Sequence, residues 1–238
     1  MITPSLFFVS IPAALTPWFP EDKPLWHILS HIKEAIAAIV SASPGKYREI
    51  SEGVFVGDNL IIDKCVELKA PVLIGKGCLI RHGALIRDNV IIGDNCTVGN
   101  STEIKNSVLF DHVEVPHFNY IGDSILGNYA HMGAGAKISN VLLLKNKREI
   151  IRQKETASGT LLKEVKIKNT DGNWIETGLT KFGAVIGDFA EIGVNSTINP
   201  GTLLEMNVFV PPSVSIGGYF RAGHKFPKSI IYAADSPI

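Results

Sequence analysis

A six-residue repeat constrains the fold of this chain more than any other feature of its sequence. Large apolar residues occupy every sixth position of a first stretch: Val56, Ile62, Leu68, Ile74, Ile80, Ile86, Ile92, Val98, Ile104 and Phe110. After an interruption, the same spacing returns at Ile186, Ile192, Ile198, Leu204, Val210 and Ile216. Most residues two positions earlier are small, such as Cys78, Ala84 and Ala190. A regular repeat of this kind indicates one structural unit that stacks on copies of itself.

A period of six fits neither an amphipathic helix, with 3.6 residues per turn, nor a hairpin meander. It predicts an all-β fold, a parallel β-helix whose coils have three faces of six residues each. At eighteen residues per coil the repeat gives about eight coils, stacked ~4.8 Å apart. The phase slips near Pro116 by one or two residues. We expect the large residue of each hexad to point into the interior, with the small residue beside it.

The remaining segments divide the chain. We expect residues 1–52 to form an N-terminal extension with a short helix over Pro24–Val40, because Pro begins an apolar pattern of helical spacing there. Residues 53–217 are expected to form the β-helix, interrupted by an insertion at 146–180, with a tail at 218–238. A hairpin is predicted inside the insertion around Asp171-Gly172.

Composition excludes several classes of protein. The chain has 238 residues, of which 45% are hydrophobic and only 19% charged, so it can build a core rather than remain disordered. Equal numbers of basic and acidic residues, 23 each, argue against nucleic-acid or membrane-surface binding. Three cysteines without C-x-x-C spacing favour neither a zinc site nor a disulfide framework. The apolar stretch 1–19 contains three prolines and no basic residue, which predicts a cytoplasmic protein rather than a secreted or membrane-spanning one.

Side chains that break the repeat are the candidates for chemistry. The clearest break is VEVPHFNYIGDS, residues 113–124, which brings His117 and Tyr120 close together in sequence. Arg87 and Lys105 lie eighteen residues apart, so they should stack on successive coils as a cationic column suited to a phosphate. Each of these residues alone is more typical of a solvated face or a subunit contact than of a site. Their coincidence on one edge favours an anion-binding site.

Four segments resemble a known family: VGNSTEIK (98–105), VPHFNYIGDS (115–124), MGAGAKISN (132–140) and TKFGAVIGD (180–188). They are similar to the acetyltransferase domain of bifunctional glucosamine-1-phosphate acetyltransferase/N-acetylglucosamine-1-phosphate uridyltransferase, and more so to archaeal-type sugar-phosphate nucleotidyltransferases with such a C-terminal domain. The resemblance covers about residues 53–217. It implies a left-handed hexapeptide-repeat β-helix, a homotrimer with sites between chains, and acetyl-CoA as co-substrate rather than a tightly bound cofactor.

The resemblance also assigns roles to particular residues. It implies His117 as the catalytic base, and a backbone contact of Ala134 with acetyl-CoA. The implied sugar-phosphate ligands are Arg87, Lys105, Tyr120, Asn140 and Lys181. Two positions depart from the family: His131 stands where a substrate-binding Asn is usual, and Val194 where a Ser often meets the coenzyme. We expect both to keep their binding positions, with altered amine positioning and coenzyme affinity.

These roles fit the chemistry of acetyl transfer to an amine. The attacking nitrogen of an amino sugar loses a proton, which a neutral imidazole can accept near neutral pH. Arg87, Lys105 and Lys181 would hold the sugar 1-phosphate, and a backbone N–H would stabilise the thioester oxyanion. Because no cysteine accompanies these residues, we expect direct transfer without an acyl-enzyme, serving nucleotide-sugar synthesis for the cell envelope.

The first fifty residues are too few for a nucleotidyltransferase domain, and no glycine-rich loop of the L-x-A-G-x-G-T-R type occurs. We therefore expect no uridyltransferase activity from this chain; its PLWHILSHI segment resembles the linker that precedes the β-helix in those enzymes. Formation of UDP-sugar from UTP by the purified chain would contradict this expectation.

Two other classes stay open. His82, His112 and His117 are loosely similar in arrangement to the zinc ligands of γ-class carbonic anhydrases, which are also trimeric β-helices. The chain could also be a noncatalytic scaffold. Within the enzyme class, the acceptor could be a UDP-linked amino sugar, and the basic insertion could cover it or form a solvated hairpin.

Overall fold

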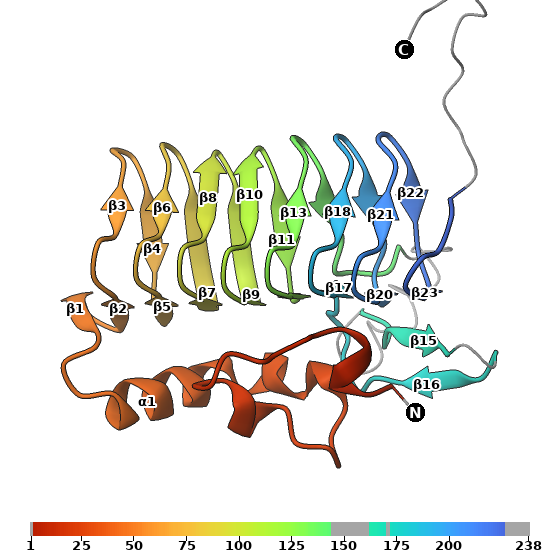
Figure 1. Cartoon of the computed structure of the whole chain (residues 1–238), viewed down its shortest axis with the longest axis horizontal. Coiled ribbons are helices and arrows are strands. Elements are labelled where there is room, and N and C mark those ends of the chain that lie inside the picture. The colour runs from red at the N-terminus through yellow and green to blue at the C-terminus, as the bar shows by residue number, and fades with distance from the viewer. Residues whose placement is uncertain (1, 144–161, 170–171, 227–238) are drawn as a thin grey trace, which may run out of the picture.

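The strands stack into a parallel β-helix, which confirms the fold predicted from the repeat (Figure 1). The structure is a computed structural model that describes residues 2–143, 162–169 and 172–226. Residues 144–161 and 170–171, which include parts of the predicted insertion at 146–180, and the end of the tail (227–238) lie outside the described residues. Each coil contributes one strand to each of three faces, which we call the first, second and third face.

The first face is a seven-stranded parallel sheet. Its strands are β3 (Ile61–Ile62), β6 (Leu79–Ile80), β8 (Thr97–Asn100), β10 (Glu114–His117), β13 (His131–Met132), β18 (Glu191–Ile192) and β21 (Phe209–Val210). The other two faces join into one sheet because β7 (Leu85–Ile92) and β9 (Glu103–Leu109) each continue around the corner between them.

The second face holds the first halves of β7 and β9 together with β4 (Glu67–Lys69), β11 (Tyr120–Gly122), β14 (Lys137–Ile138), β19 (Thr197–Ile198) and β22 (Ser215–Ile216). The third face holds the second halves of β7 and β9 together with β2 (Val54–Val56), β5 (Val72–Ile74), β12 (Ile125–Leu126), β17 (Ala184–Ile186), β20 (Thr202–Leu204) and β23 (Tyr219–Phe220). A short strand, β1 (Arg48–Ser51), pairs antiparallel with β2 and leads into the first coil.

The phase slip lies at Asn106, ahead of the predicted position near Pro116. Arg87 pairs with Lys105, but Val90 pairs with Ser107, so Asn106 alone stands opposite the two residues 88 and 89. The missing residue shifts the inward positions of the next coil. Leu109 therefore pairs with Ile92 in the interior, and Phe110, which the hexad reading places inside, packs outside the third face.

The outer side of the third face is apolar as well as its inner side. Six of its outward residues are buried, Leu73, Ile91, Val108, Ile125, Val185 and Leu203, and Phe55 and Tyr219 at the two ends of the face are partly buried. Continuous apolar runs such as VLI and AVI are typical of strands that are covered on both sides. A second core therefore lies outside the β-helix, between this face and the N-terminal segment.

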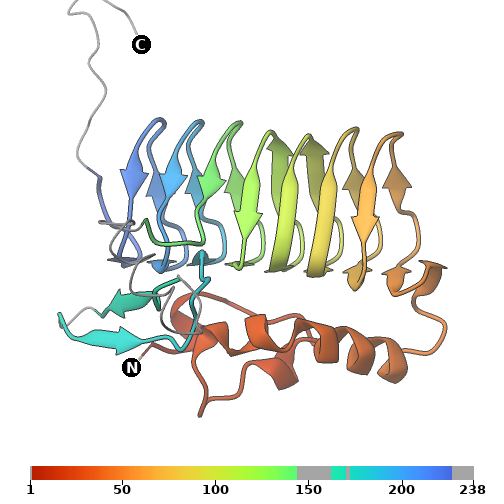
Figure 2. The same ribbon diagram turned by 180° about the vertical axis from the view of Figure 1, so that it is seen from behind.

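The N-terminal segment covers that face along the length of the stack (Figures 1 and 2). It contains three 3₁₀ helices, η1 (Pro4–Leu6), η2 (Thr16–Trp18) and η3 (Leu25–Ser30), followed by α1 (Ile32–Ala42). The helix predicted over Pro24–Val40 is thus two helices. His31 separates them because its backbone, at φ −132°, leaves the helical region.

The insertion contains the predicted hairpin, formed by β15 (Lys166–Lys168) and β16 (Trp174–Glu176). It docks on the N-terminal segment: the indole N–H of Trp26 donates to the carbonyl of Thr177 at 3.1 Å, and Val165 joins the second core. Within the described part of the chain, the helices are all too short or too polar for a transmembrane span.

We expect Phe8→Ala to destabilise the protein by about 3–5 kcal/mol, because it opens a cavity in a well-packed core. The Phe8 ring is 4% exposed and lies 4.7 Å from the ring of Phe110 and 6.0 Å from that of Phe19. The measurement is urea unfolding at fixed protein concentration. Val9→Ala is the matched control, since its side chain is 70% exposed and should change stability by less than ~0.5 kcal/mol. Equal effects of the two substitutions would contradict the second core.

Candidate functional site

The parallel register brings four of the predicted substrate-binding residues to one end of the second face. Arg87 pairs with Lys105, and Lys105 pairs with Gly122 on the next coil. A Cβ on Gly122 would lie 2.7 Å from Asn140 Nδ2 and 2.8 Å from the Tyr120 hydroxyl, so these side chains would have to move. The Tyr120 and Asn140 side chains therefore meet over Gly122, beside the stacked cations.

Both cations of this column are already paired with carboxylates. Arg87 contacts Glu103 through Nη2 at 2.7 Å and Nε at 2.8 Å, and it also bonds Asp88. Lys105 Nζ lies 3.8 Å from Asp123 Oδ2. The predicted cationic column thus exists, but with its charge largely balanced. An anionic ligand would have to share these cations with the carboxylates or displace them.

Tyr120 is poised as a hydrogen-bond donor. Burial raises the pKa of its hydroxyl, and the carboxylates of Glu103 and Asp123 raise it further. The neutral phenol remains protonated at physiological pH and can donate to a ligand oxygen.

Asp123 connects this group of residues, and the predicted site did not include it. Its carboxylate is 4% exposed and accepts hydrogen bonds from Asn140 Nδ2 and, at 2.9 Å, from Asn106 Nδ2. Asn106 in turn donates to the carbonyl of Leu29 in the N-terminal segment at 3.2 Å. The sequence signal is the recurrence of Asn106, Asp123 and Asn140 at equal spacing after the slip. Asp123 thereby fixes both Lys105 and Asn140.

His117, Ala134 and Val194 stack in one corner, where the first face turns into the second. The N–H of Gly135 donates to the carbonyl of His117, and the N–H of Asn195 to that of Ala134, both at 2.9 Å. The His117 and Val194 side chains are exposed. The buried amide of Asn119, also absent from the predicted site, braces this corner by accepting from the His117 N–H and donating to the carbonyl of Gly133.

Lys181 lies next to Asn140. The N–H of the following residue, Phe182, donates to the Asn140 carbonyl at 2.9 Å, where the chain returns from the insertion to the β-helix. The Lys181 side chain is exposed. The register therefore places it at the end of the second face that holds Tyr120 and Lys105.

His131 is the predicted site residue that lies elsewhere. It begins β13 on the first face, and its Nδ1 lies 2.7 Å from Glu191 Oε2. A hollow of about 510 Å³ surrounds this pair, and its lining includes Tyr129 and Phe189. Within one chain, His131 and Lys105 are therefore on different faces of the β-helix.

Three stacked rings border this hollow. His112 and Tyr129 lie 4.5 Å apart and Tyr129 and Phe189 5.2 Å apart, with nearly parallel planes. All three residues have positive φ angles, between 57° and 60°, a backbone region that bulky side chains seldom adopt. The hexad pattern gives no signal for this ladder, because it follows corner residues rather than inward ones.

The histidines of the zinc alternative do not converge within the chain. His112 precedes β10 and His117 ends it, so they lie at opposite corners of the first face. Among residues 2–143, 162–169 and 172–226, no group of three or more His, Cys, Asp or Glu side chains is arranged to hold a metal ion.

Comparisons with known proteins match this chain over part of its length. The profile of the GMPPB C-terminal domain matches residues 68–170. Over 115 residues the chain is 34% identical to a bifunctional sugar-1-phosphate nucleotidylyltransferase/acetyltransferase of Sulfurisphaera tokodaii, a match covering 48% of this chain and 21% of that protein. Over 104 residues it is 30% identical to the bifunctional protein GlmU of Methanococcus aeolicus, covering 44% and 21%. The predicted resemblance is confirmed.

The chain spans about one fifth of the length of these curated relatives, at 21% of each. Among solved structures, it is similar to a hexapeptide transferase family protein from Anaplasma phagocytophilum, with 15% identity, a TM-score of 0.35, and coverage of 71% of this chain and 80% of that one. It is also similar to the N-acyltransferase AntD from Bacillus cereus, with 18% identity, a TM-score of 0.33, and coverage of 74% and 82%.

Asp123→Asn should lower the free energy of unfolding by about 1–3 kcal/mol, because an amide N–H₂ would then face the donor of Asn106 or Asn140 in a buried position. Urea unfolding measures the change. Asp58→Asn, at an exposed carboxylate on the first coil, is the control and should have almost no effect. A stability of Asp123→Asn equal to that of the control would show that Asp123 does not organise the site.

Proposed function

We propose that the chain is an N-acetyltransferase that moves an acetyl group from acetyl-CoA to the amine of an amino-sugar phosphate of the glucosamine-1-phosphate type. One observation carries the proposal: the register gathers Arg87, Lys105, Tyr120 and Asn140 at one end of the second face. The similarity to proteins named sugar-1-phosphate nucleotidylyltransferase/acetyltransferase supports the reaction class.

In this proposal the sugar phosphate binds across the second face. Arg87, Lys105 and Lys181 attract the phosphate, which replaces part of the contact that Glu103 and Asp123 now make. Tyr120 and Asn140 donate hydrogen bonds to the ligand. Holding both substrates in one orientation removes much of the entropic barrier to transfer.

The imidazole of His117 accepts the proton that the sugar nitrogen releases as it attacks the thioester carbonyl. The nitrogen–carbon bond forms, the carbon–sulfur bond breaks, and CoA leaves as the thiolate, which takes up a proton. Acetyl-CoA extends along the corner of His117, Ala134 and Val194, and a backbone N–H that is not used between coils would stabilise the oxyanion.

We also propose a homotrimer in which neighbouring chains share each site. His131 lies on a different face from Lys105 and Tyr120, so one chain does not bring it to the same ligand. A neighbouring chain that places its first face against the second face of this one would supply His131 and the hollow around it.

A noncatalytic scaffold is the second candidate function. The observation that favours it is the existing pairing of Arg87 and Lys105 with carboxylates, which makes a stable surface without any ligand. An intact oligomer that releases no CoA with any amino-sugar acceptor would support this candidate over the enzyme.

Steady-state kinetics should separate the two roles within the site. With acetyl-CoA and glucosamine-1-phosphate, we expect His117→Ala to lower kcat by about 10²-fold or more, since it removes the base. Lys105→Met should raise KM for the sugar phosphate about tenfold and leave KM for acetyl-CoA nearly unchanged.

The matched control is His82→Ala, an exposed histidine at the same corner near the start of the β-helix. Unchanged thiol release by His117→Ala would remove the proposed base. Loss of activity in His82→Ala would show that the effect of His117→Ala is not specific to the proposed base. Bound zinc in the wild type, with no thiol release from acetyl-CoA, would favour the carbonic-anhydrase-like alternative instead.

Subunit mixing tests whether neighbouring chains share a site. His117→Ala and His131→Ala proteins, each weakly active, are unfolded and refolded together as an equal mixture. In random trimers about one quarter of the sites would join an intact His117 to an intact His131, so about a quarter of wild-type activity should return. Sedimentation confirms that mixed trimers form. Mixed trimers that stay at the activity of the parent variants would contradict a shared site.

A further inference from the structure

A ladder of polar side chains follows the corner between the third and first faces. Asp94, Asp111, Asn128 and Asp188 each accept a hydrogen bond from the backbone N–H of the ladder residue on the preceding coil, at 3.0, 2.7, 3.3 and 2.7 Å in turn. Asn128 makes this bond with a neutral amide oxygen. The ladder therefore requires an acceptor at each position, and it does not require the negative charge of Asp94 and Asp111.

At the far end of the ladder, the N-terminal segment uses the spare oxygen. Asp188 Oδ2 accepts the N–H of Val9 at 2.8 Å, and Asn128 Nδ2 donates to the carbonyl of Ser10 at 2.9 Å. Near Asp111 the N-terminal segment consists of residues 12–15. The first of these is a proline, which has no backbone N–H to donate. Among the described residues, none donates a hydrogen bond to Asp111 Oδ2.

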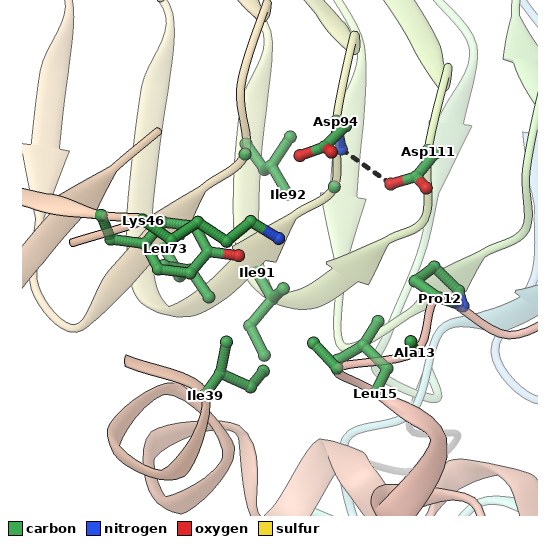
Figure 3. A pocket seen from close by; sticks show the side chains of 14 residues that line it. Pro12, Ala13, Leu15, Ile39, Lys46, Leu73, Ile91, Ile92, Asp94 and Asp111 are labelled. Carbon is green, nitrogen blue, oxygen red and sulfur yellow. Dashed lines mark hydrogen bonds between the residues drawn. The ribbon is translucent and has the colours of Figure 1, made fainter. Parts of the chain in front are cut away.

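A cavity of about 200 Å³ lies at this point, between the N-terminal segment and the third face (Figure 3). Asp94 and Asp111 lie along one edge of it, and Lys46 reaches in from the opposite side. The apolar part of the lining includes Leu15, Ile39, Leu73 and Ile91. The pocket thus combines an anionic edge, one cation and an apolar floor.

Lys46 has no ion-pair partner among the described residues; its ammonium lies 5.2 Å from the centre of the Tyr47 ring. Partial burial lowers the pKa of Lys46, but the Tyr47 hydroxyl and the carboxylates of Asp94 and Asp111 together raise it above its ordinary value. The ammonium is therefore charged at physiological pH, and it can accept a carboxylate partner.

We propose that this pocket binds a free α-amino acid with an apolar side chain. Its ammonium group bonds the spare oxygen of Asp111 and faces Asp94, its carboxylate pairs with Lys46, and its side chain packs on Ile39, Leu73 and Ile91. A simple amine would leave Lys46 unpaired, and a fatty acid would place its apolar chain against two carboxylates. A zwitterion with an apolar part offers a partner to Asp111, to Lys46 and to the apolar floor. Asp94 Oδ2 already lies 4.0 Å from Lys76 Nζ, so this carboxylate needs no further partner.

Isothermal titration of the purified full-length chain with L-leucine, together with its thermal shift, tests the proposal. Binding to the folded state raises the unfolding temperature, and the stabilisation grows with the logarithm of one plus the ratio of free ligand concentration to Kd. Two analogues remove one charge each: N-acetyl-L-leucine lacks the ammonium group and isoamylamine lacks the carboxylate. We expect each to bind at least tenfold more weakly than leucine, a difference of about 1.4 kcal/mol.

Two variants test the residues. Asp111→Asn keeps the oxygen that accepts the Asp94 N–H and removes only the charge, and Lys46→Met removes the ammonium from an exposed segment. Each should weaken leucine binding at least tenfold. The controls, Asp58→Asn and Lys64→Met, change exposed residues outside the cavity and should leave binding unchanged. If Asp111→Asn does not fold, the leucine affinity of Lys46→Met alone tests whether the pocket is the binding site.

Three results would overturn the proposal. The first is no binding of L-leucine or L-phenylalanine to the wild type at concentrations up to about 10 mM, where even a millimolar affinity is detected. The second is leucine binding that Lys46→Met and the folded Asp111→Asn both retain. The third is isoamylamine binding as tightly as leucine, which would indicate a site for simple amines.

Discussion

The backbone hydrogen bonds between successive coils are the constraint on which the rest of this protein depends. Each strand pairs with the strands above and below it in parallel register, so residues one coil apart must lie in a column. A single residue lost at a corner then moves every later column. Asn106 shows this effect, because the slip there exchanges Phe110 for Leu109 in the interior and turns the Phe110 ring toward the N-terminal segment.

The stacking of residues from successive coils also explains how a regular fold can carry a polar site. Residues far apart in sequence become neighbours on one face, as Arg87, Lys105 and Gly122 do, and the side chains of Tyr120 and Asn140 close over the glycine. The same closeness gathers carboxylates. Glu103 and Asp123 lie within reach of the cations they neighbour, so the site is preorganised by ion pairs and a ligand must compete with them.

The N-terminal segment converts the β-helix from a bare stack into a molecule with two cores. It covers the apolar outer side of the third face. It also contacts Asn106 beside the polar site, through the carbonyl of Leu29, and the ladder of Asp94 to Asp188, through the N–H of Val9 at Asp188. At Asp111 the segment makes no such hydrogen bond with the ladder among the described residues, and a charged cavity lies there. The polar site and the cavity are therefore both set by how closely this segment follows the coils.

The sequence by itself determined the β-helix and the stacking of Arg87 on Lys105, because a six-residue period allows few other arrangements. Local signals in it predicted one N-terminal helix and the inserted hairpin. Tertiary structure decided the rest. The position of the slip at Asn106 depends on which corner of the coil has one residue fewer. The hexad spacing does not show which corner this is. Three further features depend on the tertiary structure: the pairing of Lys105 with Asp123, the position of His131 on the first face, and the stacking of the Tyr129 ring on its neighbours. They involve corner or outward residues of neighbouring coils. The contacts of such residues depend on the three-dimensional register and not on the apolar pattern.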